Sequence, residues 1–512
     1  MVQFLRIEGV NFRAFLDDTL DLSIIRGGGL LLLRASELAR EVIEGQGVPV
    51  TVVNSGASVG IFSFEATADA TEAIRLKIEE NLAADLYLRH ATFVVDTAPQ
   101  DPGFAQTRAQ LMAKNRWRQM QTLSLVYPSL EPALIDKQRV CEADHLRPAA
   151  RQLRHWDILE RKPVIEALSQ SSFQRHEYGR DQRVRFYQNE AVIPNGIFAD
   201  DLNEIAGDAN EYGSLDRKVA VIHLDGNKFG SLFADHCQTP ELQAAASEKL
   251  RSHQRTFLQD LFQAIHIHPH GWYLRRAREN GQEVDALRLE TLIWGGDELR
   301  FVVPAWKAVY FLDLFFRAAQ SWQLFGGGIP VTHSAGLVFC NCKCNIHSAA
   351  ALAKELCETA KEIYREDHGN DADLLVYQVL ESFDHIGQGV NRSYMTGHFP
   401  FLGENALPIA LRAANLRYIW MEAAILRDAI PRRRLHEVVH HLMAKRLDPA
   451  QRVIEDTCRE LSESLPRLRR LSSLLGGADE FNPAAWFHLN ELWDYVGFEA
   501  WQFPAPASGN AQ

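Results

Sequence analysis

The sequence predicts an α+β protein with two ferredoxin-like domains, a helical domain between them and a second helical domain near the C-terminal end. Strand-like and helix-like segments follow one another in the order β-α-β-β-α-β twice along the chain, as in a ferredoxin-like fold. A buried-type strand ends at Asp225, beside a glycine turn that opens a helix. Farther along, two apolar runs flank a Gly-Gly-acid-acid turn at 295–298. This pattern predicts a β-hairpin, because Gly-Gly accepts the positive φ angles of a tight turn.

The composition is that of a soluble globular protein of two to four domains, with 512 residues, 46% of them hydrophobic and 23% charged. A net charge of −12 argues against broad, unspecific binding of nucleic acid but allows a local basic face. The sequence has no apolar run of transmembrane length and no signal-peptide pattern, and its seven cysteines are irregularly spaced. We therefore expect a cytoplasmic protein that does not contact a membrane.

The first ferredoxin-like domain is expected over residues 1–97. A Gly-Gly-Gly turn at 27–29 is expected to lead into its first helix, and a turn at 55–58 to join its second and third strands. The expected elements are a strand at 2–12, a helix at 30–44, strands at 48–54 and 59–64, a helix at 67–83 and a strand at 86–95.

A mostly helical middle domain is expected over residues 98–214, with a basic amphipathic helix at 107–121. The second ferredoxin-like domain follows over 215–385. Its expected elements are a strand ending at Asp225, helical segments through 265, a hairpin at 289–304, a helix at 306–325, a strand at 332–340, a helix at 347–365 and a strand at 374–379.

The last part of the chain is expected to hold a helical domain at 386–503 and a disordered Pro/Ala/Ser/Gly-rich tail at 504–512. Two basic runs, 432–434 and 467–470, are interpreted as solvated helix faces, with RNA contact as the alternative.

Three acids, Asp225, Asp297 and Glu298, meet at one sheet edge if the strand that ends at Asp225 pairs with the hairpin. Carboxylates this close together are costly unless a cation lies between them. A glycine turn at the start of a helix also offers free backbone N–H groups to an anion. The arrangement predicts a site for one or two Mg²⁺ ions and a nucleoside triphosphate, with a solvated acidic turn as the alternative.

The two motifs together, Asp-Gly-Asn-Lys-Phe-Gly at 225–230 and Gly-Gly-Asp-Glu-Leu at 295–299, resemble those of the palm-type nucleotidyl cyclases. This group includes the GGDEF diguanylate cyclases and the large polymerase/cyclase subunit of type III CRISPR effector complexes. The sequence is more similar to the CRISPR-type palm, because of the apolar run at 301–304, the strand at 334–339 and the alanine-rich helix after Ile346. The resemblance covers residues 215–382 well and the rest loosely.

This resemblance implies a palm-domain nucleotidyltransferase that makes a cyclic oligonucleotide signal in antiviral defence, with cyclic oligoadenylate from ATP favoured. It implies Asp225, Asp297 and Glu298 as catalytic residues, and the same three with Gly226 as ligands of Mg²⁺ or Mn²⁺. The residues expected to bind nucleotide are Asn227, Lys228, Phe229, Gly230, Gly295, Gly296 and Lys361 near the metal, and Ser55 and Gly56 in the first domain.

The first domain has no acid at the corresponding tip, 54–58, so it is interpreted as a catalytically silent palm. Fused in the same chain, it would supply the pocket for the nucleotide that offers its 3′-hydroxyl, unless it is only a docking platform. Two features depart from the CRISPR subunit. No His-Asp nuclease motif precedes Val2, and Cys141 alone remains where the family often has a zinc-binding Cys-x-x-Cys knuckle, so no zinc is expected there.

Two other functions stay open, a diguanylate cyclase-like enzyme and a catalytically inactive palm scaffold that binds RNA and partner subunits. The expected partners are nucleoside triphosphates, with guide or target RNA and CRISPR effector subunits as further candidates. Metal binding is the weaker interpretation for two more rows of residues. These are three alternating cysteines on a predicted strand, followed by a histidine, and three alternating histidines in a predicted loop: Cys340, Cys342, Cys344 and His347, and His266, His268 and His270.

Overall fold

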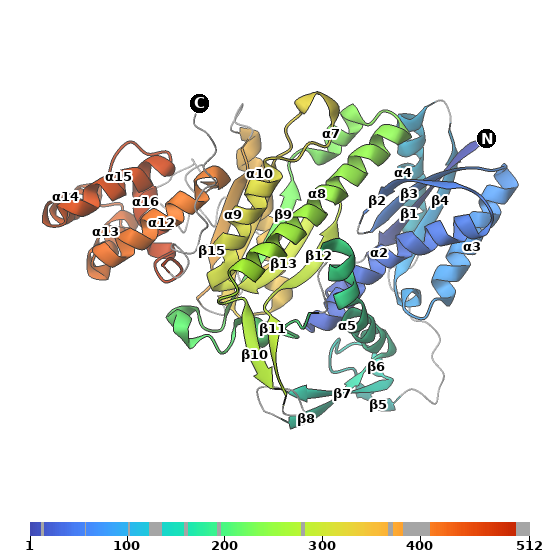
Figure 1. Ribbon diagram of the computed structural model, residues 1–512, viewed down its shortest axis with the longest axis horizontal. Coiled ribbons are helices and arrows are strands. Elements are labelled where there is room, and N and C mark those ends of the chain that lie inside the picture. The colour runs from blue at the N-terminus through green and yellow to red at the C-terminus, as the bar shows by residue number, and fades with distance from the viewer. Residues whose placement is uncertain are drawn as a thin grey trace.

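The computed structural model describes residues 1–11, 15–56, 58–100, 103–121, 136–157, 162–191, 196–277, 282–366, 372–381 and 410–497. In this part of the chain, two larger β-sheets with their helices lie side by side, and a group of C-terminal helices flanks the second sheet (Figure 1). Three two-stranded sheets lie at the lower end of the molecule in the same view. The predicted α+β class is therefore confirmed.

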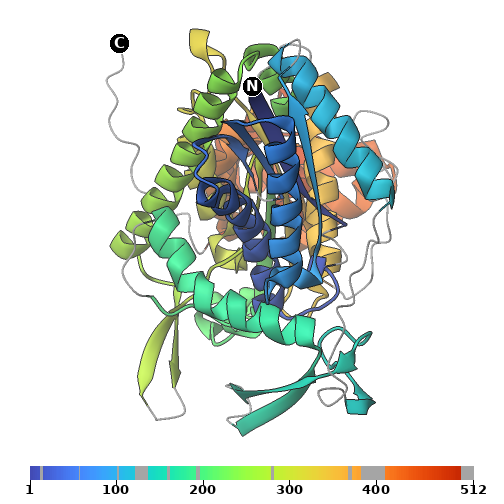
Figure 2. The ribbon, with the colours of Figure 1, turned by 90° about the vertical axis from the view of Figure 1, so that its right-hand side faces the viewer.

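The first sheet is formed by described residues before position 101, and this part of the chain, drawn in blue, lies on the side nearest the viewer in Figure 2. Its strands have the order β2-β3-β1-β4, and each neighbouring pair is antiparallel. This is the ferredoxin-like order, in which each β-α-β crossover leaves room for one strand between its ends. Its elements are β1 (Val2–Val10), α2 (Leu22–Gly45), β2 (Val50–Ser55), β3 (Val59–Glu65), α3 (Ala68–Ala84) and β4 (Thr92–Pro99), in the predicted sequence of types.

Both faces of this sheet are buried, because successive side chains of a strand point to opposite faces. On one face, Leu5 and Ile7 of β1 pack with α2 and α3 in one apolar core. On the other face, the ring of Phe4 lies 5.4 Å from the ring of Phe104 in α4 (Phe104–Gln121). The basic helix expected at the start of the middle segment therefore belongs to the core of the first sheet.

Helix α2 contains the Gly-Gly-Gly run, so the expectation of a turn at 27–29 is wrong. The helix begins at Leu22, after Asp21 accepts a hydrogen bond from the Ile24 N–H (2.9 Å). It crosses α5 (Gln170–Ala191) at very short range, since a Cβ added to Gly27 would lie 1.9 Å from the carbonyl oxygen of Arg175. The crossing, and not a turn, requires the glycine.

Replacing Gly27 by alanine is expected to lower the melting temperature by several degrees. The added methyl group has to push α2 and α5 apart, and overpacking of this kind costs about 1–3 kcal/mol. Gly45→Ala is the matched control, because Gly45 lies in the same helix and an added Cβ there meets no atom within 4 Å. Thermal unfolding followed by circular dichroism measures both. Equal melting temperatures for the two variants would contradict the close crossing.

The middle segment is less helical than predicted, because it contains four short strands. They are β5 (Asp136–Val140), β6 (Pro148–Ala149), β7 (Arg151–Asp157) and β8 (Lys162–Leu168), and α5 and α6 (Leu202–Ala206) follow them. β7 and β8 form a hairpin with charged and apolar residues in close succession. Runs this short do not show a clear alternation of apolar and polar residues, which is the pattern that predicts a strand.

The second sheet has the strand order β12-β13-β9-β14-β15-β16, and its first four strands repeat the order of the first sheet. Its elements are β9 (Lys218–Gly226), α7 (Phe229–His236), α8 (Pro240–Ile267), β12 (Glu290–Gly295), β13 (Glu298–Pro304), α9 (Ala308–Ala319), β14 (His333–Asn341), α10 (Ile346–Glu366), β15 (Leu374–Val379) and β16 (Leu411–Arg412). A hairpin of β10 (Tyr273–Ala277) and β11 (Glu283–Leu287) is inserted before β12 and was not expected. The boundaries assigned to the domains stay predictions.

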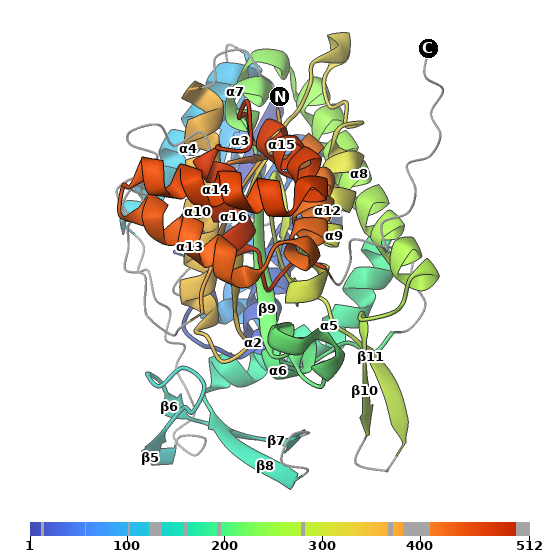
Figure 3. The same ribbon diagram turned by 90° about the vertical axis from the view of Figure 1, so that its left-hand side faces the viewer.

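The C-terminal helices face the viewer in Figure 3 and are α12 (Ala413–Ala429), α13 (Arg432–Met443), α14 (Leu447–Glu460), α15 (Leu465–Leu474) and α16 (Pro483–Glu491). The arginines of the two basic runs mostly pair with acids of the same region, which favours the solvated-face interpretation. These pairs are Arg432–Asp494, Arg434–Glu460, Arg467–Glu422, Arg469–Glu480 and Arg470–Glu422. The tail at 504–512 lies outside the described residues. None of the helices in the described ranges is long and apolar enough to cross a lipid bilayer.

Candidate functional site

The end of β9 and the tip of the β12–β13 hairpin are neighbours at one edge of the second sheet. β13 runs antiparallel beside β9, which brings the hairpin tip next to Asp225. The tip turns at two glycines, Gly295 with φ 144° and Gly296 with φ 62°. Residues with side chains rarely adopt such angles, so the Gly-Gly pair allows the turn that places Asp297 and Glu298.

Asp225 and Asp297 are largely buried carboxyl groups that interact with each other. Burial and the negative charge of Asp297 raise the pKa of Asp225 from 3.8 to about 7. Burial also raises the pKa of Asp297, although its own backbone N–H, Lys361 and a hydrogen bond with Asp225 act in the opposite direction. Lys361 of α10 places its Nζ 2.6 Å from Asp225 Oδ2. The raised pKa values mean that negative charge on these two acids is unfavourable unless a cation lies nearby. A cation at this place, such as the ammonium group of Lys361, is therefore stabilised.

The raised pKa of Asp225 predicts that the stability of the metal-free protein falls as the pH rises. Between pH 3.8 and about 7, the folded protein holds a proton that the unfolded chain has released. The stability that this proton contributes is present at low pH and is lost as the pH rises through 7. Asp225→Asn carries no such charge, so its melting temperature is expected to fall less between pH 5.5 and 8.5, by a few degrees. Parallel pH profiles of the two proteins, measured with EDTA, would contradict the shift.

Glu298 lies beside two cationic side chains, Lys354 and Arg300, and beside His223, whose pKa is held well below its usual value by burial. The Glu298 Oε1 lies 3.6 Å from Lys354 Nζ, 3.7 Å from His223 Nε2 and 3.7 Å from an Arg300 nitrogen. In the described residues, no group of three or more Asp, Glu, His or Cys side chains is arranged to hold a metal ion. The negative charge of Glu298 nevertheless contributes to raising the pKa of both Asp225 and Asp297, so the three acids lie near one another as expected. The role of Glu298 as a metal ligand stays a prediction.

This pair of acids fits Mg²⁺ in the way that nucleotide enzymes bind it. Mg²⁺ is usually held by one or two carboxylates and by substrate phosphates, rather than by a complete set of protein ligands. Asp225 and Asp297 supply two carboxylates, and the ammonium group of Lys361 already lies where a cation is favourable. Mn²⁺ prefers the same oxygen ligands.

The turn after Asp225 leads directly into α7. Gly226 has to be glycine, because an added Cβ would lie 2.2 Å from the ring of Phe229. Lys228 has φ 58° and precedes the first helical residue, so the N–H groups of Phe229 and Gly230 belong to the first turn and have no acceptor within the helix. This is the backbone geometry at which phosphates bind.

One residue of that turn, Asn227, differs from the expectation. The Asn227 N–H donates to the carbonyl oxygen of Thr332 (2.8 Å), so it is not available to a phosphate. The side chain of Asn227 is also engaged, since its Oδ1 accepts a hydrogen bond from Ser334 (2.8 Å). The Nζ of Lys228 lies 5.1 Å from the ring centre of Tyr364 on α10. Asn227 therefore holds the turn in place, and its direct binding to nucleotide stays a prediction.

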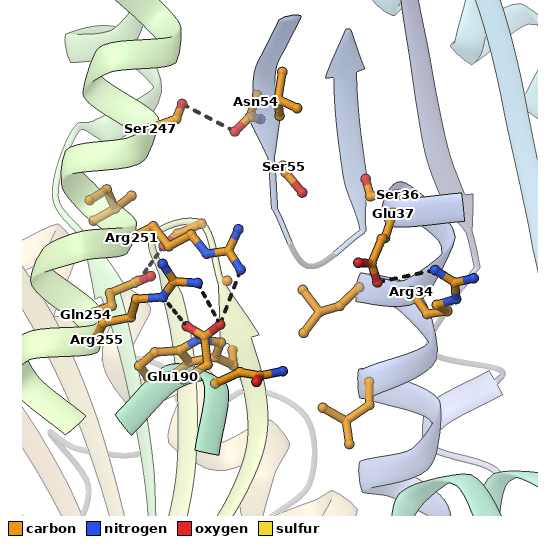
Figure 4. Close-up of a pocket in the computed structure, with 18 of the residues that line it drawn as sticks. Arg34, Ser36, Glu37, Asn54, Ser55, Glu190, Ser247, Arg251, Gln254 and Arg255 are labelled. Carbon is orange, nitrogen blue, oxygen red and sulfur yellow. Dashed lines mark hydrogen bonds and ion pairs between the residues drawn. The ribbon is translucent and has the colours of Figure 1, made fainter. Parts of the chain in front are cut away.

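A cavity of about 910 Å³ opens between the first and second sheets. We call these sheets, each together with its helices, the first and the second unit. The walls of the cavity come from α2 and β2 of the first unit, from α5, and from α7, α8 and the hairpin tip of the second unit (Figure 4). Predicted site residues from both units line it, namely Ser55, Phe229, Gly230, Gly295, Gly296 and Asp297. Its volume lies in the upper part of the range of roughly 300–1,000 Å³ that is usual for ligand pockets.

Gly56 lies in a second, smaller cavity of about 250 Å³ next to the first, with Gly296, Asp297 and Glu298 in its wall. A Cβ added to Gly56 would lie 3.9 Å from the Gly296 nitrogen. The acid-free tip of the first unit therefore lies against the acidic tip of the second.

Sequence reasoning missed a polar cluster that lines the larger cavity. Glu190 of α5 accepts hydrogen bonds from Arg251 and Arg255 of α8 and from the indole N–H of Trp294, each at 3.2 Å. Gln254 donates to the carbonyl oxygen of Gly296 (2.7 Å), so α8 also holds the hairpin tip. Figure 4 shows the two arginines turned toward Glu190. Arg251 and Arg255 are four residues apart on one helix face, a visible signal, but nothing in the sequence identifies their partner.

The cysteine and histidine rows do not have the arrangement expected of them. β14 ends at Asn341, so Cys342 and Cys344 lie in the following turn and not on one face of a strand. Cys340 and Cys342 are buried as small core residues. His266 lies in the last turn of α8 and not in a loop.

One protein family matches part of the chain: residues 218–369 fit the family model described as Cas10/Cmr2, second palm domain. No curated protein matches the sequence.

Several solved structures match the chain. A Csm1-Csm4 cassette in complex with cA4 has a TM-score of 0.48 and 14% identity, with 96% of this chain and 69% of that chain covered. Csm1 in T.onnurineus has a TM-score of 0.41 and 16% identity, with 73% and 52% covered. A Csm1-Csm4 cassette in complex with AMPPNP has a TM-score of 0.40 and 14% identity, with 73% and 54% covered. The chain thus spans about half the length of the last two.

At such low identities and TM-scores, the assignment rests on the family model, which covers the strand of Asp225, the Gly-Gly-Asp-Glu hairpin and most of α10. Residues 218–369 therefore match the second palm domain of the Cas10/Cmr2 family, in agreement with the resemblance seen in the sequence.

Proposed function

We propose that this chain joins nucleoside triphosphates into a cyclic oligonucleotide signal, with ATP as substrate and Mg²⁺ or Mn²⁺ as cofactor. One observation carries the proposal: a single cavity has the acidic tip, at Asp297, in one wall and the acid-free tip, at Ser55, in another. Joining two nucleotides requires one that offers its 3′-hydroxyl and one whose α-phosphorus is attacked, held close together. The second unit would hold the attacked nucleotide, and the first unit would act as a silent palm that holds the other.

The residues around the acidic tip have distinct roles in this proposal. Asp225 and Asp297 hold the metal, which when bound would lower the pKa of the attacking hydroxyl and neutralise charge on the leaving pyrophosphate. The N–H groups of Phe229 and Gly230 bind phosphate oxygens at the start of α7. Lys361 pairs with Asp225 before substrate binds, and its ammonium group then stabilises a phosphate.

The choice of adenine and of protein partners rests on the family alone. Structures of Csm1-Csm4 cassettes are known with AMPPNP and with cA4. For this chain we propose the same classes of partner: ATP, a Csm4-like subunit, and guide or target RNA. Type III CRISPR antiviral defence is the proposed setting.

Incubation of the purified chain with radiolabelled ATP or GTP and Mg²⁺, with and without RNA, tests the proposal. A cyclic product from ATP that disappears with EDTA is expected. A product from GTP alone would support the diguanylate cyclase alternative. Nucleotide binding without any product, with RNA and partner subunits present, would support the inactive scaffold.

A further inference from the structure

Four buried side chains meet where the small hairpins of the middle segment join the start of α5. They come as two pairs with the same spacing of three, Cys141 with Asp144 and Ser169 with Ser172. Asp144 Oδ2 accepts hydrogen bonds from Ser169 Oγ (2.7 Å) and Ser172 Oγ (2.9 Å). The two hydroxyl groups are 2.9 Å apart, and the Cys141 thiol lies 3.7 Å from Ser172 Oγ. We call these four residues the buried quartet.

The backbone of the buried quartet has the form of a structural metal site. Such sites take two ligands from each of two short turns, with two residues between the paired ligands. In the first turn, the Asp144 N–H points at Cys141 Sγ (3.4 Å), as it would toward a metal-bound sulfur. Four thiolates around Zn²⁺, each at about 2.3 Å, would be roughly 3.8 Å apart by tetrahedral geometry. The Cys141–Ser172 separation has that length, and the oxygen–oxygen distances are shorter because hydrogen bonds close the cluster.

A metal ion does not fit these residues as they stand. Two of the four ligand positions carry neutral serine hydroxyls, which are not among the usual ligands of Zn²⁺. Asp144 and Cys141 alone would leave the ion with two of its four protein ligands. The positive charge that a metal would bring is already supplied, because an Arg147 nitrogen lies 3.1 Å from Asp144 Oδ2. Arg147 also pairs with Asp18, which in turn holds Arg175 of α5 at 2.8 Å.

The electrostatics keep Asp144 ionised in this buried place. Burial alone would raise the pKa of its carboxyl group. The backbone N–H groups of Arg147 and Leu146, and the two serine hydroxyls, together hold that pKa below its usual range. Hydrogen bonds to the Asp144 carboxylate thus hold the cluster together, as bonds to the metal ion do in a zinc site.

We propose that the buried quartet is a metal-free counterpart of a four-ligand zinc site, in which one carboxylate and its hydrogen bonds fasten the middle hairpins to α5. The fold of this segment then does not depend on zinc. The quartet also fixes α5 relative to the first unit, through the Arg147–Asp18–Arg175 chain of ion pairs. Because α5 carries Glu190 into the wall of the large cavity, the quartet supports that wall at a distance.

Restoring the thiols tests the geometry. The variant Asp144→Cys/Ser169→Cys/Ser172→Cys is expected to bind one Co²⁺ per chain, with the visible absorption of tetrahedral cobalt–thiolate sites, and to gain several degrees of melting temperature with Zn²⁺. In the matched control, Ser171→Cys replaces Ser172→Cys. Ser171 is equally buried, but its hydroxyl has no hydrogen-bond partner among the described residues. The control is expected to bind Co²⁺ at least ten-fold more weakly.

The natural protein supplies the second measurement. Its melting temperature is expected to be the same with EDTA and with added Zn²⁺, whereas Asp144→Ala should lower it by several degrees, because two buried hydroxyls and Arg147 lose their partner. If the triple variant requires metal to fold, refolding with Zn²⁺ but not with EDTA counts in favour of the proposal. Stoichiometric zinc in the natural protein, lost together with its stability in EDTA, would overturn it. Equal Co²⁺ binding by the triple variant and its control would also overturn it.

Discussion

Asp297→Ala is expected to abolish product formation, lowering the rate by about 10³-fold or more. The substitution removes one of the two carboxylates that can hold the metal, and losing one electrostatic contact of this kind costs about 10²–10³ even where no metal is involved. The stability of the fold should not fall, because the charge of Asp297 is unfavourable in the folded protein. Burial raises the pKa of Asp297, and its charge also raises the pKa of Asp225. Removing that repulsion leaves the melting temperature unchanged or slightly higher.

Product analysis by thin-layer chromatography of radiolabelled ATP reactions measures the loss. Asp285→Ala provides the control, because Asp285 is an exposed acid on β11 that lines neither cavity described here. It should retain full activity. Normal amounts of product from Asp297→Ala, in a protein with an unchanged melting curve, would show that the chemistry takes place elsewhere.

The parts of the site that could be predicted depend on local signals. A strand that ends in Asp-Gly and a Gly-Gly turn between two apolar runs each specify their own geometry, and pairing of β9 with β13 then brings Asp225 and Asp297 together. The ferredoxin-like order of both sheets followed from the periodicity of longer elements, where many residues contribute to one pattern.

The parts that could not be predicted depend on contacts between distant segments. Glycine inside a helix costs about 1 kcal/mol relative to alanine, so a Gly-Gly-Gly run is normally a turn. Here the close approach of α5 reverses that preference. Glu190 and Arg255 are 65 residues apart, and no spacing rule connects them. The Asn227 N–H is not free for a phosphate, because it donates to the carbonyl oxygen of Thr332, which directly precedes β14 and lies far along the chain.

Ser55→Trp, at the acid-free tip, is expected to lower the rate of bond formation by about 10²-fold or more. ATP should still bind at Asp225 and Asp297 in this variant. Ser55 is exposed at the end of β2 and lines the larger cavity across from the hairpin tip. An indole there would fill the space proposed for the nucleotide that offers its 3′-hydroxyl, and misplacing one reactant removes most of the benefit of proximity. Gly56 is less suitable for this test, because it lies against Gly296 and a bulky side chain would also displace the acidic tip.

Thr51→Trp serves as the control, since Thr51 is exposed on the same strand but does not line this cavity. ATP binding is measured by thermal shift with Mg²⁺, and bond formation by the yield of linked nucleotides. Because both tips belong to one chain, the rate of the unaltered protein should rise in proportion to its concentration. A rate that rises with the square of the concentration, together with full activity of Ser55→Trp, would mean that two acidic palms from separate chains meet, and that the first unit is a docking platform.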